Sequence, residues 1–270
     1  MRKIAIHVTL VIVLMLHMVP LVTIFVNSLR SNSEISKALL ALPQFFDLSN
    51  YPVAWVDGNY LVAFANTFII DFGAVAIVVI VEVLAAYGLT KLDVYGKQAF
   101  IGYFVVGISV PAFAILVPLY FVFEPLGLTN SKLGMILIYA AIFMPFTLLF
   151  MRSYFVGIPR ELEEAALIDG CSELQVLRRI TLPLAMPMVT TVALIVFVNS
   201  YNEFLFANVF LQDPDEATVA LAFYSFVGKY SLDYGTIFAA AIMTLVPIVL
   251  LYFILQRRFI EGLAAGGLKG

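Results

Sequence analysis

The amino-acid sequence predicts an all-α protein that crosses a lipid bilayer six times. Of its 270 residues, 63% are hydrophobic and only 12% are charged, and the mean hydropathy is +1.02. A soluble domain of this length could not bury so much apolar surface, so we expect lipid to be its main solvent. Six stretches of the chain also approach the roughly 20 apolar residues that a spanning helix needs.

The six expected spans are separated by polar or proline-containing segments. They cover residues 4–26, 61–90, 98–123, 132–151, 184–207 and 236–255. The third span contains Pro111 and Pro118, and we expect a kink there because proline removes a hydrogen bond from a helix. We expect one membrane domain over residues 1–270, with a first span and outer loop (1–60), a five-span core (61–256) and a tail (257–270).

The first span also has the pattern of a secretory leader, because Arg2 and Lys3 precede its apolar run. That run is long enough to cross the bilayer, and no clear small-residue cleavage site follows it. We therefore expect a retained first helix.

Basic residues predict the orientation, because cytoplasmic loops are enriched in lysine and arginine. With the N-terminus inside, six spans return the C-terminus to the same side. The inside would hold Arg2, Lys3, Lys91, Lys97, Arg152, Arg160, Arg178, Arg179, Arg257, Arg258 and Lys269. The outside would hold Arg30, Lys37, Lys132 and Lys229. This bias of eleven to four predicts that both termini are cytoplasmic.

The polar segment between the fourth and fifth spans then lies in the cytoplasm and is predicted to form a helix–turn–helix. Gly170 can end the first short helix by adopting a left-handed conformation. Ser172 and Gln175 fit a capping box for a second short helix, which we expect to end near Ile180. Such a loop would present its helices to a soluble partner.

The same segment carries a sequence motif. It fits the pattern EAA-x3-G-x9-I-x-L-P at Glu164, Ala165, Ala166, Gly170, Ile180, Leu182 and Pro183. This pattern resembles the coupling loop of importer permeases in the ATP-binding-cassette superfamily. An ordinary amphipathic connector is the alternative, and the match through to the Leu-Pro pair argues against it.

Other segments resemble the smaller permease of the sugar importers typified by the maltose transporter. Asn66-Thr67 begins the second span and the Ala-Ala-Tyr-Gly run at 85–88 ends it, as in that family. The C-terminal pattern F-x-x-G-x-x-x-G-x-x-K-G, with Gly262, Gly266 and Lys269, resembles the ending of sugar permeases. One departure is Tyr201-Asn202, where sugar permeases often have Trp-Asn.

This resemblance implies half of a translocation pathway in a bacterial or archaeal cytoplasmic membrane. The implied partners are a larger second permease, two cytoplasmic ATP-binding subunits and an extracytoplasmic sugar-binding protein. It implies alternating access driven by those ATPases, with coupling at the EAA loop and contacts from the tail. The chain itself would be neither an enzyme nor a cofactor-binding protein.

Ionisable residues inside the expected spans are candidates for the pathway, because such residues usually face a bundle interior or a wet cavity. Tyr201, Asn202 and Glu203 near the outer end of the fifth span, together with Asp71, form the candidate substrate site. Structural pairing of these carboxylates is the alternative. For Glu82 we expect solvation near the cytoplasmic end of its span.

The remaining sequence argues against other classes of function. The net charge of −3 disfavours nucleic acid as a partner, and the single cysteine, Cys171, has no apparent catalytic base. No residues have metal-ligand spacing, so no metal site is expected. An importer for another solute, such as a polyamine or glycerol phosphate, stays open. A secondary transporter would need an ion-coupling cluster, and the sequence has only scattered carboxylates.

Overall fold

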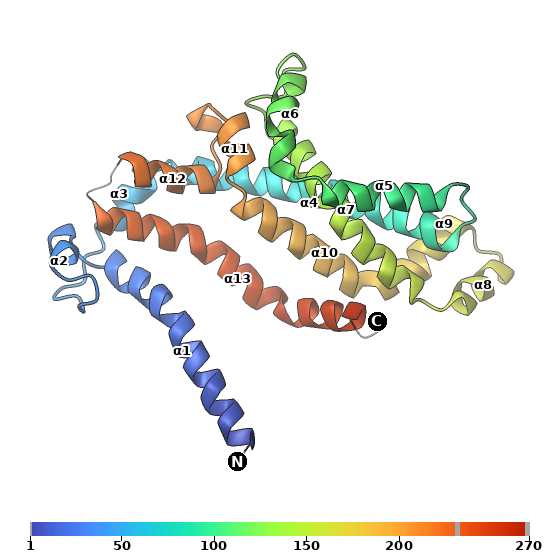
Figure 1. Cartoon of the computed structure of the whole chain (residues 1–270), viewed down its shortest axis with the longest axis horizontal. Helices are drawn as coiled ribbons and strands as arrows, with labels where there is room; N and C mark the ends of the chain where they lie inside the picture. The colour runs from blue at the N-terminus through green and yellow to red at the C-terminus, as the bar shows by residue number, and fades with distance from the viewer. Residues whose placement is uncertain (1, 230–232, 268–270) are drawn as a thin grey trace. The chain divides into compact units, whose positions relative to one another are not determined.

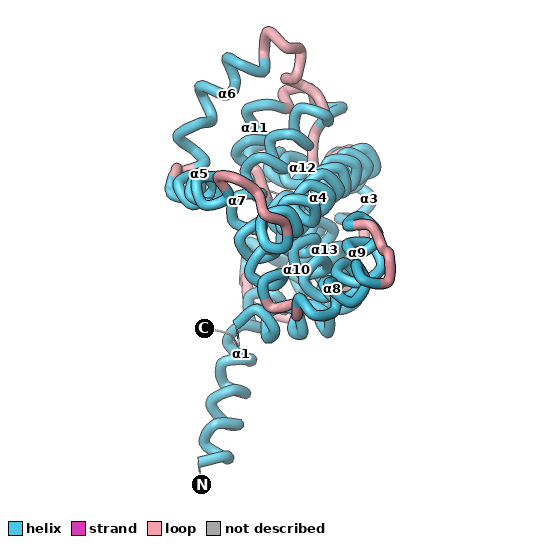
Figure 2. The backbone as a smooth tube through the Cα atoms, turned by 90° about the vertical axis from the view of Figure 1, so that its right-hand side faces the viewer, coloured by secondary structure: helices cyan, strands magenta, loops and turns pink. Residues whose placement is uncertain are grey.

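The computed structural model describes residues 2–229 and 233–267, and helices dominate this part of the chain (Figure 1). Figure 2 shows helices joined by loops, with no strand in the described ranges. This confirms the all-α class. The chain forms two compact units, residues 1–65 with 217–250, and residues 66–216 with 251–270.

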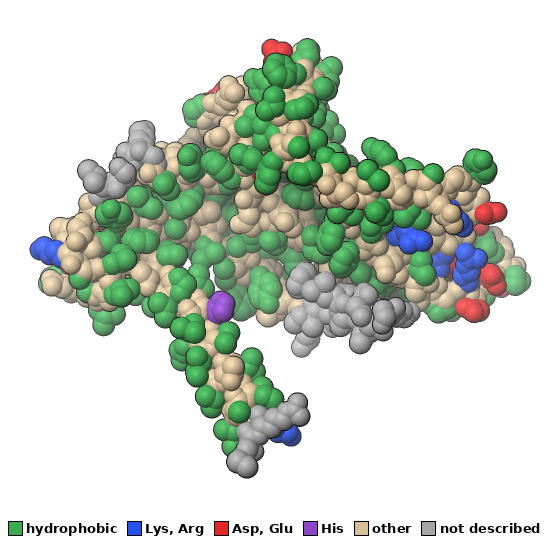
Figure 3. Space-filling model, in the orientation of Figure 1, with side chains coloured by type: hydrophobic (Ala, Val, Ile, Leu, Met, Phe, Trp, Pro, Cys, Tyr) green, Lys and Arg blue, Asp and Glu red, His purple; other side chains and the backbone are tan. Residues whose placement is uncertain are grey.

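The first unit contains helices α1 (Arg2–Ser28), α2 (Asn32–Lys37), α3 (Asn50–Asp57) and α12 (Val219–Lys229), with the start of α4 (Tyr60–Lys91) and the first half of α13 (Tyr234–Gly267). Apolar side chains are exposed along α1, as in a helix that faces lipid (Figure 3). The chain after α1 is fixed by Asn50, whose Nδ2 donates to the carbonyls of Ser28 and Arg30, both at 3.0 Å.

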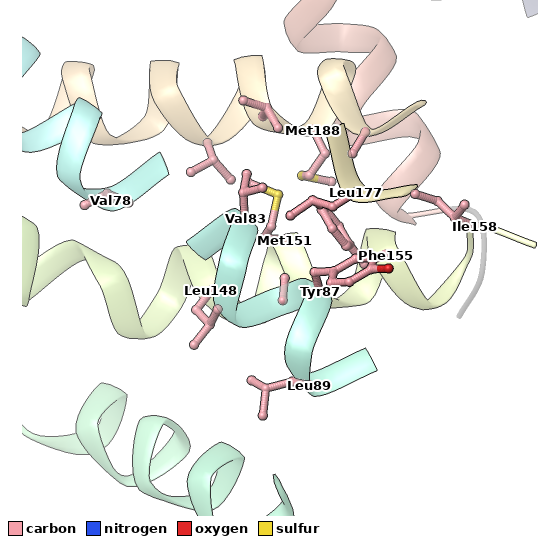
Figure 4. Close-up of a cluster of buried hydrophobic side chains, with 14 of the residues drawn as sticks. Val78, Val83, Tyr87, Leu89, Leu148, Met151, Phe155, Ile158, Leu177 and Met188 are labelled. Atoms are coloured by element: carbon pink, nitrogen blue, oxygen red, sulfur yellow. The ribbon is translucent and has the colours of Figure 1, made fainter. Parts of the chain in front are cut away.

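The second unit holds the remaining helices around one apolar core. They are the rest of α4 and of α13, with α5 (Lys97–Ser109), η1 (Ala112–Ile115), α6 (Leu116–Phe123), α7 (Lys132–Val156), α8 (Arg160–Ile168), α9 (Glu173–Val176), η2 (Leu177–Thr181), α10 (Leu182–Asn202), α11 (Leu205–Phe210) and η3 (Pro214–Glu216). Its core lies where α4, α7 and the start of α10 meet, with Tyr87, Phe155 and Leu177 drawn together in Figure 4.

Among the described residues, five helices are long and apolar enough to cross a membrane, and a bent pair raises the number to six. The pair is α5 with residues 112–123, which meet at 91°. The bend lies at Pro111, so the expected kink is confirmed but is too sharp for one straight span. Pro118 lies inside α6 without breaking it.

The fifth span differs from its expected form at both ends. The expected second short helix does not end near Ile180, because α9 continues through a π-helical turn, Leu177–Thr181, into α10. Proline clashes with the carbonyl four residues earlier, and for Pro183 that carbonyl belongs to Arg179, inside this wider turn. At the other end α10 stops at Asn202, before the expected limit of 207.

The C-terminal region also differs from expectation. Helix α13 continues to Gly267, so Gly262 and Gly266, which the sequence places in a tail after the last span, lie in the same helix as that span. Lys269 lies outside the described residues. Helix α12 was not expected, because eleven residues are too few to cross a bilayer.

Candidate functional site

Charged side chains gather on the loop formed by α8 and α9, whereas few charged side chains are visible elsewhere on this face (Figure 3). Acidic residues Glu161 and Glu163 lie in the first turn of α8, where they favour the positive end of the helix dipole. This loop joins α7 to α10, and it carries the sequence motif.

The turn between α8 and α9 has the conformation that the sequence predicts. Gly170 has a φ of +85°, the Gly170 amide donates to Leu167 O at 3.0 Å, and the Cys171 amide donates to Ala166 O at 2.9 Å. These two bonds form a Schellman motif, which ends a helix at a left-handed residue. The capping box is also present, since Gln175 Oε1 accepts from the Ser172 amide at 2.8 Å.

The inner face of α8 is attached to the end of α4 by a buried ion pair. Lys91 Nζ lies 3.2 Å from Glu163 Oε1, and the two side chains are only 4% and 8% exposed. Thr181 Oγ1 donates to the same Glu163 oxygen at 2.9 Å, and Lys91 Nζ also donates to Ile158 O at 2.8 Å. Sequence reasoning missed this cluster, because Glu163 and Lys91 are far apart in the chain.

A second attachment joins α9 to α4. Tyr87 Oη donates to Glu173 Oε2 at 2.6 Å, and Arg160 Nη2 donates to Thr90 O at 3.1 Å. These groups border a polar cavity of about 160 Å³ between the last turns of α4 and the two short helices. The end of α4 therefore holds both helices of the loop.

The outer face of α8 exposes apolar side chains next to a carboxylate. Ala165 is exposed, and so are Leu162 and Ile168, the latter 86%. Glu164 lies beside them and is also exposed, whereas Ala166 is buried against the protein. The motif residues are therefore divided between the two faces. The last three, Ile180, Leu182 and Pro183, lie where the π-helical turn meets α10.

Two of the four candidate pathway residues, Asp71 and Glu203, have polar partners on neighbouring helices. Asp71, 1% exposed, shares a side-chain hydrogen bond with Ser200. Tyr139 Oη donates to Glu203 Oε2 at 3.0 Å. Tyr201 is buried, and the centroid of its ring lies 6.0 Å from that of Phe197. Only one of the four candidates, Asn202, is exposed, and its Nδ2 donates to Val198 O at 2.7 Å.

Glu203 has a structural contact that sequence reasoning did not foresee. Its carboxylate accepts from the amides of Phe206 at 2.9 Å and Ala207 at 3.1 Å. These are unpaired donors in the first turn of α11, so Glu203 caps that helix just after α10 ends. The Glu203 carboxylate thus links α7, α10 and α11.

The expectation that Glu82 is solvated near a membrane surface is wrong. Glu82 is 0% exposed, and it accepts a hydrogen bond from Thr147 Oγ1 on α7. It lies nine residues before Lys91, the last residue of α4, which is roughly 13 Å of helix. That distance is too great for solvation at the end of the helix.

Known proteins are similar to this chain in sequence and in fold. The family model "Binding-protein-dependent transport system inner membrane component" matches residues 83–264. The diacetylchitobiose uptake system permease protein NgcG of Streptomyces coelicolor is 32% identical over 96% of this chain and 87% of its own length. The trehalose/maltose transport system permease protein MalG of Thermococcus litoralis is 34% identical over 76% of this chain and 74% of its own.

A solved structure matches most of the chain. It is the crystal structure of a bacterial ABC transporter involved in the import of alginate, and its matching chain has a TM-score of 0.83 at 25% identity. The match covers 95% of this chain and 96% of that one. Together with several apolar helices and the matched residues 83–264, these likenesses identify a multi-pass membrane protein. The chain belongs to the family of inner membrane components of binding-protein-dependent transport systems.

Proposed function

We propose that this chain is one of two membrane-spanning subunits of an ATP-driven importer for a sugar or oligosaccharide. The observation that carries the proposal is the division of α8 into two faces. One face is bound to α4 by a buried ion pair, and the other exposes apolar residues beside the EAA motif. The sugar is supported by the named substrates of NgcG and MalG and by the C-terminal motif.

The proposed mechanism is alternating access. Two separate ATPase subunits close on ATP and press on the loop of α8 and α9 at the cytoplasmic side. A binding protein delivers the sugar at the opposite side, and a second, larger permease completes the pathway. The cytoplasmic placement of the loop and of both termini rests on the eleven-to-four bias of basic residues.

We expect Ala165→Arg to reduce co-purification of the ATPase with the permease complex by about tenfold, because it places a charge in a contact that must exclude water. The measurement is the amount of ATPase recovered with the tagged permease in detergent. Ala99→Arg is the matched control, since Ala99 is an exposed alanine in the first turn of α5. Normal recovery with Ala165→Arg would contradict the proposed docking face.

We also propose that the C-terminal segment with Gly262, Gly266 and Lys269 contacts the ATPases. Its motif resembles the ending of sugar permeases, and the charge bias places it on the same side as α8. Truncation before Gly262 in the same co-purification experiment measures this contact. Unchanged recovery and unchanged ATP hydrolysis would exclude it.

The outer end of α10 is proposed to border the sugar pathway, with Asn202 exposed and Tyr201, Glu203 and Asp71 supporting it. Asn202→Ala is expected to lower sugar uptake severalfold, with assembly and basal ATP hydrolysis retained. Glu203→Ala should instead reduce the yield of assembled complex, because it leaves two amides of α11 and Tyr139 without their acceptor. Full uptake by Asn202→Ala would remove Asn202 from the pathway.

Uptake measurements distinguish a sugar importer from an importer of another solute and from a secondary transporter. Proteoliposomes that contain the permease pair and its ATPase, together with the binding protein, are assayed with labelled diacetylchitobiose, maltose and trehalose. Putrescine and glycerol phosphate serve as the competing solutes. ATP-dependent uptake of a sugar supports the proposal, whereas uptake of only a competing solute would reassign the substrate. Uptake driven by an ion gradient without ATP would indicate a secondary transporter.

A further inference from the structure

We propose that Lys91, Glu163 and Thr181 form a latch that makes α8 move together with α4 and with the π-helical turn that leads into α10. The proposal rests on the proposed function, because it assumes that a partner presses on α8. It assigns positioning roles to three residues, of which two lie outside the EAA motif and one, Thr181, lies inside its variable stretch.

The latch converges on one buried oxygen. Glu163 Oε1 receives Lys91 Nζ at 3.2 Å and Thr181 Oγ1 at 2.9 Å. Lys91 Nζ also donates to Ile158 O, in the short connection between α7 and α8. The Glu163 carboxylate on α8 is thus joined directly to α4 and to the π-helical turn before α10, and through Lys91 to the connection after α7.

Burial decides what this ion pair contributes. The free energy needed to remove two charges from water is nearly as large as the attraction between them in the protein. A buried ion pair is therefore weak evidence for net stability. Removing only one partner destabilises the protein strongly, because it leaves an uncompensated buried charge. The pair therefore fixes the position of α8 more than it stabilises the fold, and α8 cannot leave α4 without exposing or isolating a charge.

A second bond makes the attachment rigid. Tyr87 precedes Lys91 by four residues, so both side chains leave the same face of α4. Tyr87 holds Glu173 of α9, whereas Lys91 holds Glu163 of α8. The two bonds lie on opposite sides of the Gly170 turn, so the loop cannot rotate about either one alone. A force on α8 is then transmitted to α4, which carries Asp71, and to α10, which carries Ser200.

Hydrogen exchange of the complete importer in nanodiscs tests the latch. The complex is compared without nucleotide and after trapping with ATP and vanadate, by mass spectrometry of peptides that cover residues 87–91 and 160–168. In the wild-type complex we expect both segments to change exchange rate, by about tenfold. A change at 160–168 with none at 87–91 would overturn the latch. No change at 160–168 would instead overturn the proposed contact of α8.

The double variant Lys91→Met/Glu163→Gln separates positioning from folding. It removes both charges of the pair, so no lone buried charge remains and the complex should assemble with unchanged thermal stability. We expect trapping to slow hydrogen exchange in residues 160–168 but no longer to change it in residues 87–91. We also expect the stimulation of ATP hydrolysis by the binding protein to fall about tenfold. A wild-type response at 87–91 would contradict the latch.

Two further variants complete the design. Lys91→Arg keeps a donor of the same charge and should recover most of the response at 87–91. Lys97→Met removes a half-exposed lysine at the start of α5 and is expected to behave as wild type. If the double variant fails to assemble, Thr181→Val provides the decisive measurement. It keeps the side-chain shape, loses one bond to Glu163, and should weaken the response of peptides covering 177–181 while 87–91 still responds.

Discussion

Gly170→Pro is expected to abolish ATP-driven uptake while the permease still inserts in the membrane. Gly170 has a φ of +85°, and proline holds φ near −65°. Proline also lacks the amide that donates to Leu167 O at 3.0 Å, so half of the Schellman motif is lost. The end of α8 would then lose the turn that places α8 and α9 against α4. Stimulation of ATP hydrolysis by the loaded binding protein is the measurement.

Two further substitutions at Gly170 distinguish the effect of backbone conformation from that of side-chain size. A Cβ at Gly170 would meet no atom within 4 Å, so overlap at that atom is not the problem. Gly170→Asn should retain much of the activity, because asparagine tolerates the left-handed region. Gly170→Val should fall between asparagine and proline, since a left-handed conformation costs an L-residue roughly 1–2 kcal/mol. Equal activity for all three variants would contradict this account.

Gly134→Ala is expected to give the largest loss of assembled protein. Gly134 lies in the first turn of α7, and an added Cβ would overlap the backbone carbonyl oxygen of Leu128. A backbone group cannot rotate aside as a side chain can, so either the 124–131 connection or α7 must shift. We expect a cost of about 1–3 kcal/mol and a fall in melting temperature of roughly 2–12 °C.

The control for Gly134→Ala is Gly102→Ala in α5. A Cβ at Gly102 would meet no atom within 4 Å, and alanine favours a helix more than glycine does. Its melting temperature in detergent should therefore match or exceed that of the wild type. If Gly134→Ala is as stable as Gly102→Ala, the close approach of Leu128 to α7 is incorrect.

Sequence reasoning succeeded where the structure depends on neighbouring residues. The limits of α4 differ from the expected 61–90 by one residue at each end, because a long apolar run between polar residues defines a span. Gly170 and the Ser172–Gln175 capping box were also predicted correctly. Their signals lie within a few positions of the turn that they stabilise.

Sequence reasoning failed where the structure depends on contacts between distant residues. The pairing of Lys91 with Glu163, and of Glu82 with Thr147, requires knowing how α4 packs against α8 and α7. The continuity of α9 with α10 was missed because the second short helix was expected to end near Ile180, and a π-helical turn has no clear sequence signal. The substrate contacts and the cytoplasmic docking of α8 remain predictions.

The π-helical turn has a consequence for how this region can vary. Such a turn holds one residue more than an α-helical turn would, and each residue of an α-helix rotates the chain by about 100°. The extra residue therefore sets the rotational phase of α10 relative to α9. A substitution within Leu177–Thr181 keeps the number of residues in the turn and so leaves this rotational phase unchanged. Loss of a single residue would turn the buried face of α10, with Met188 and Val192, away from the core.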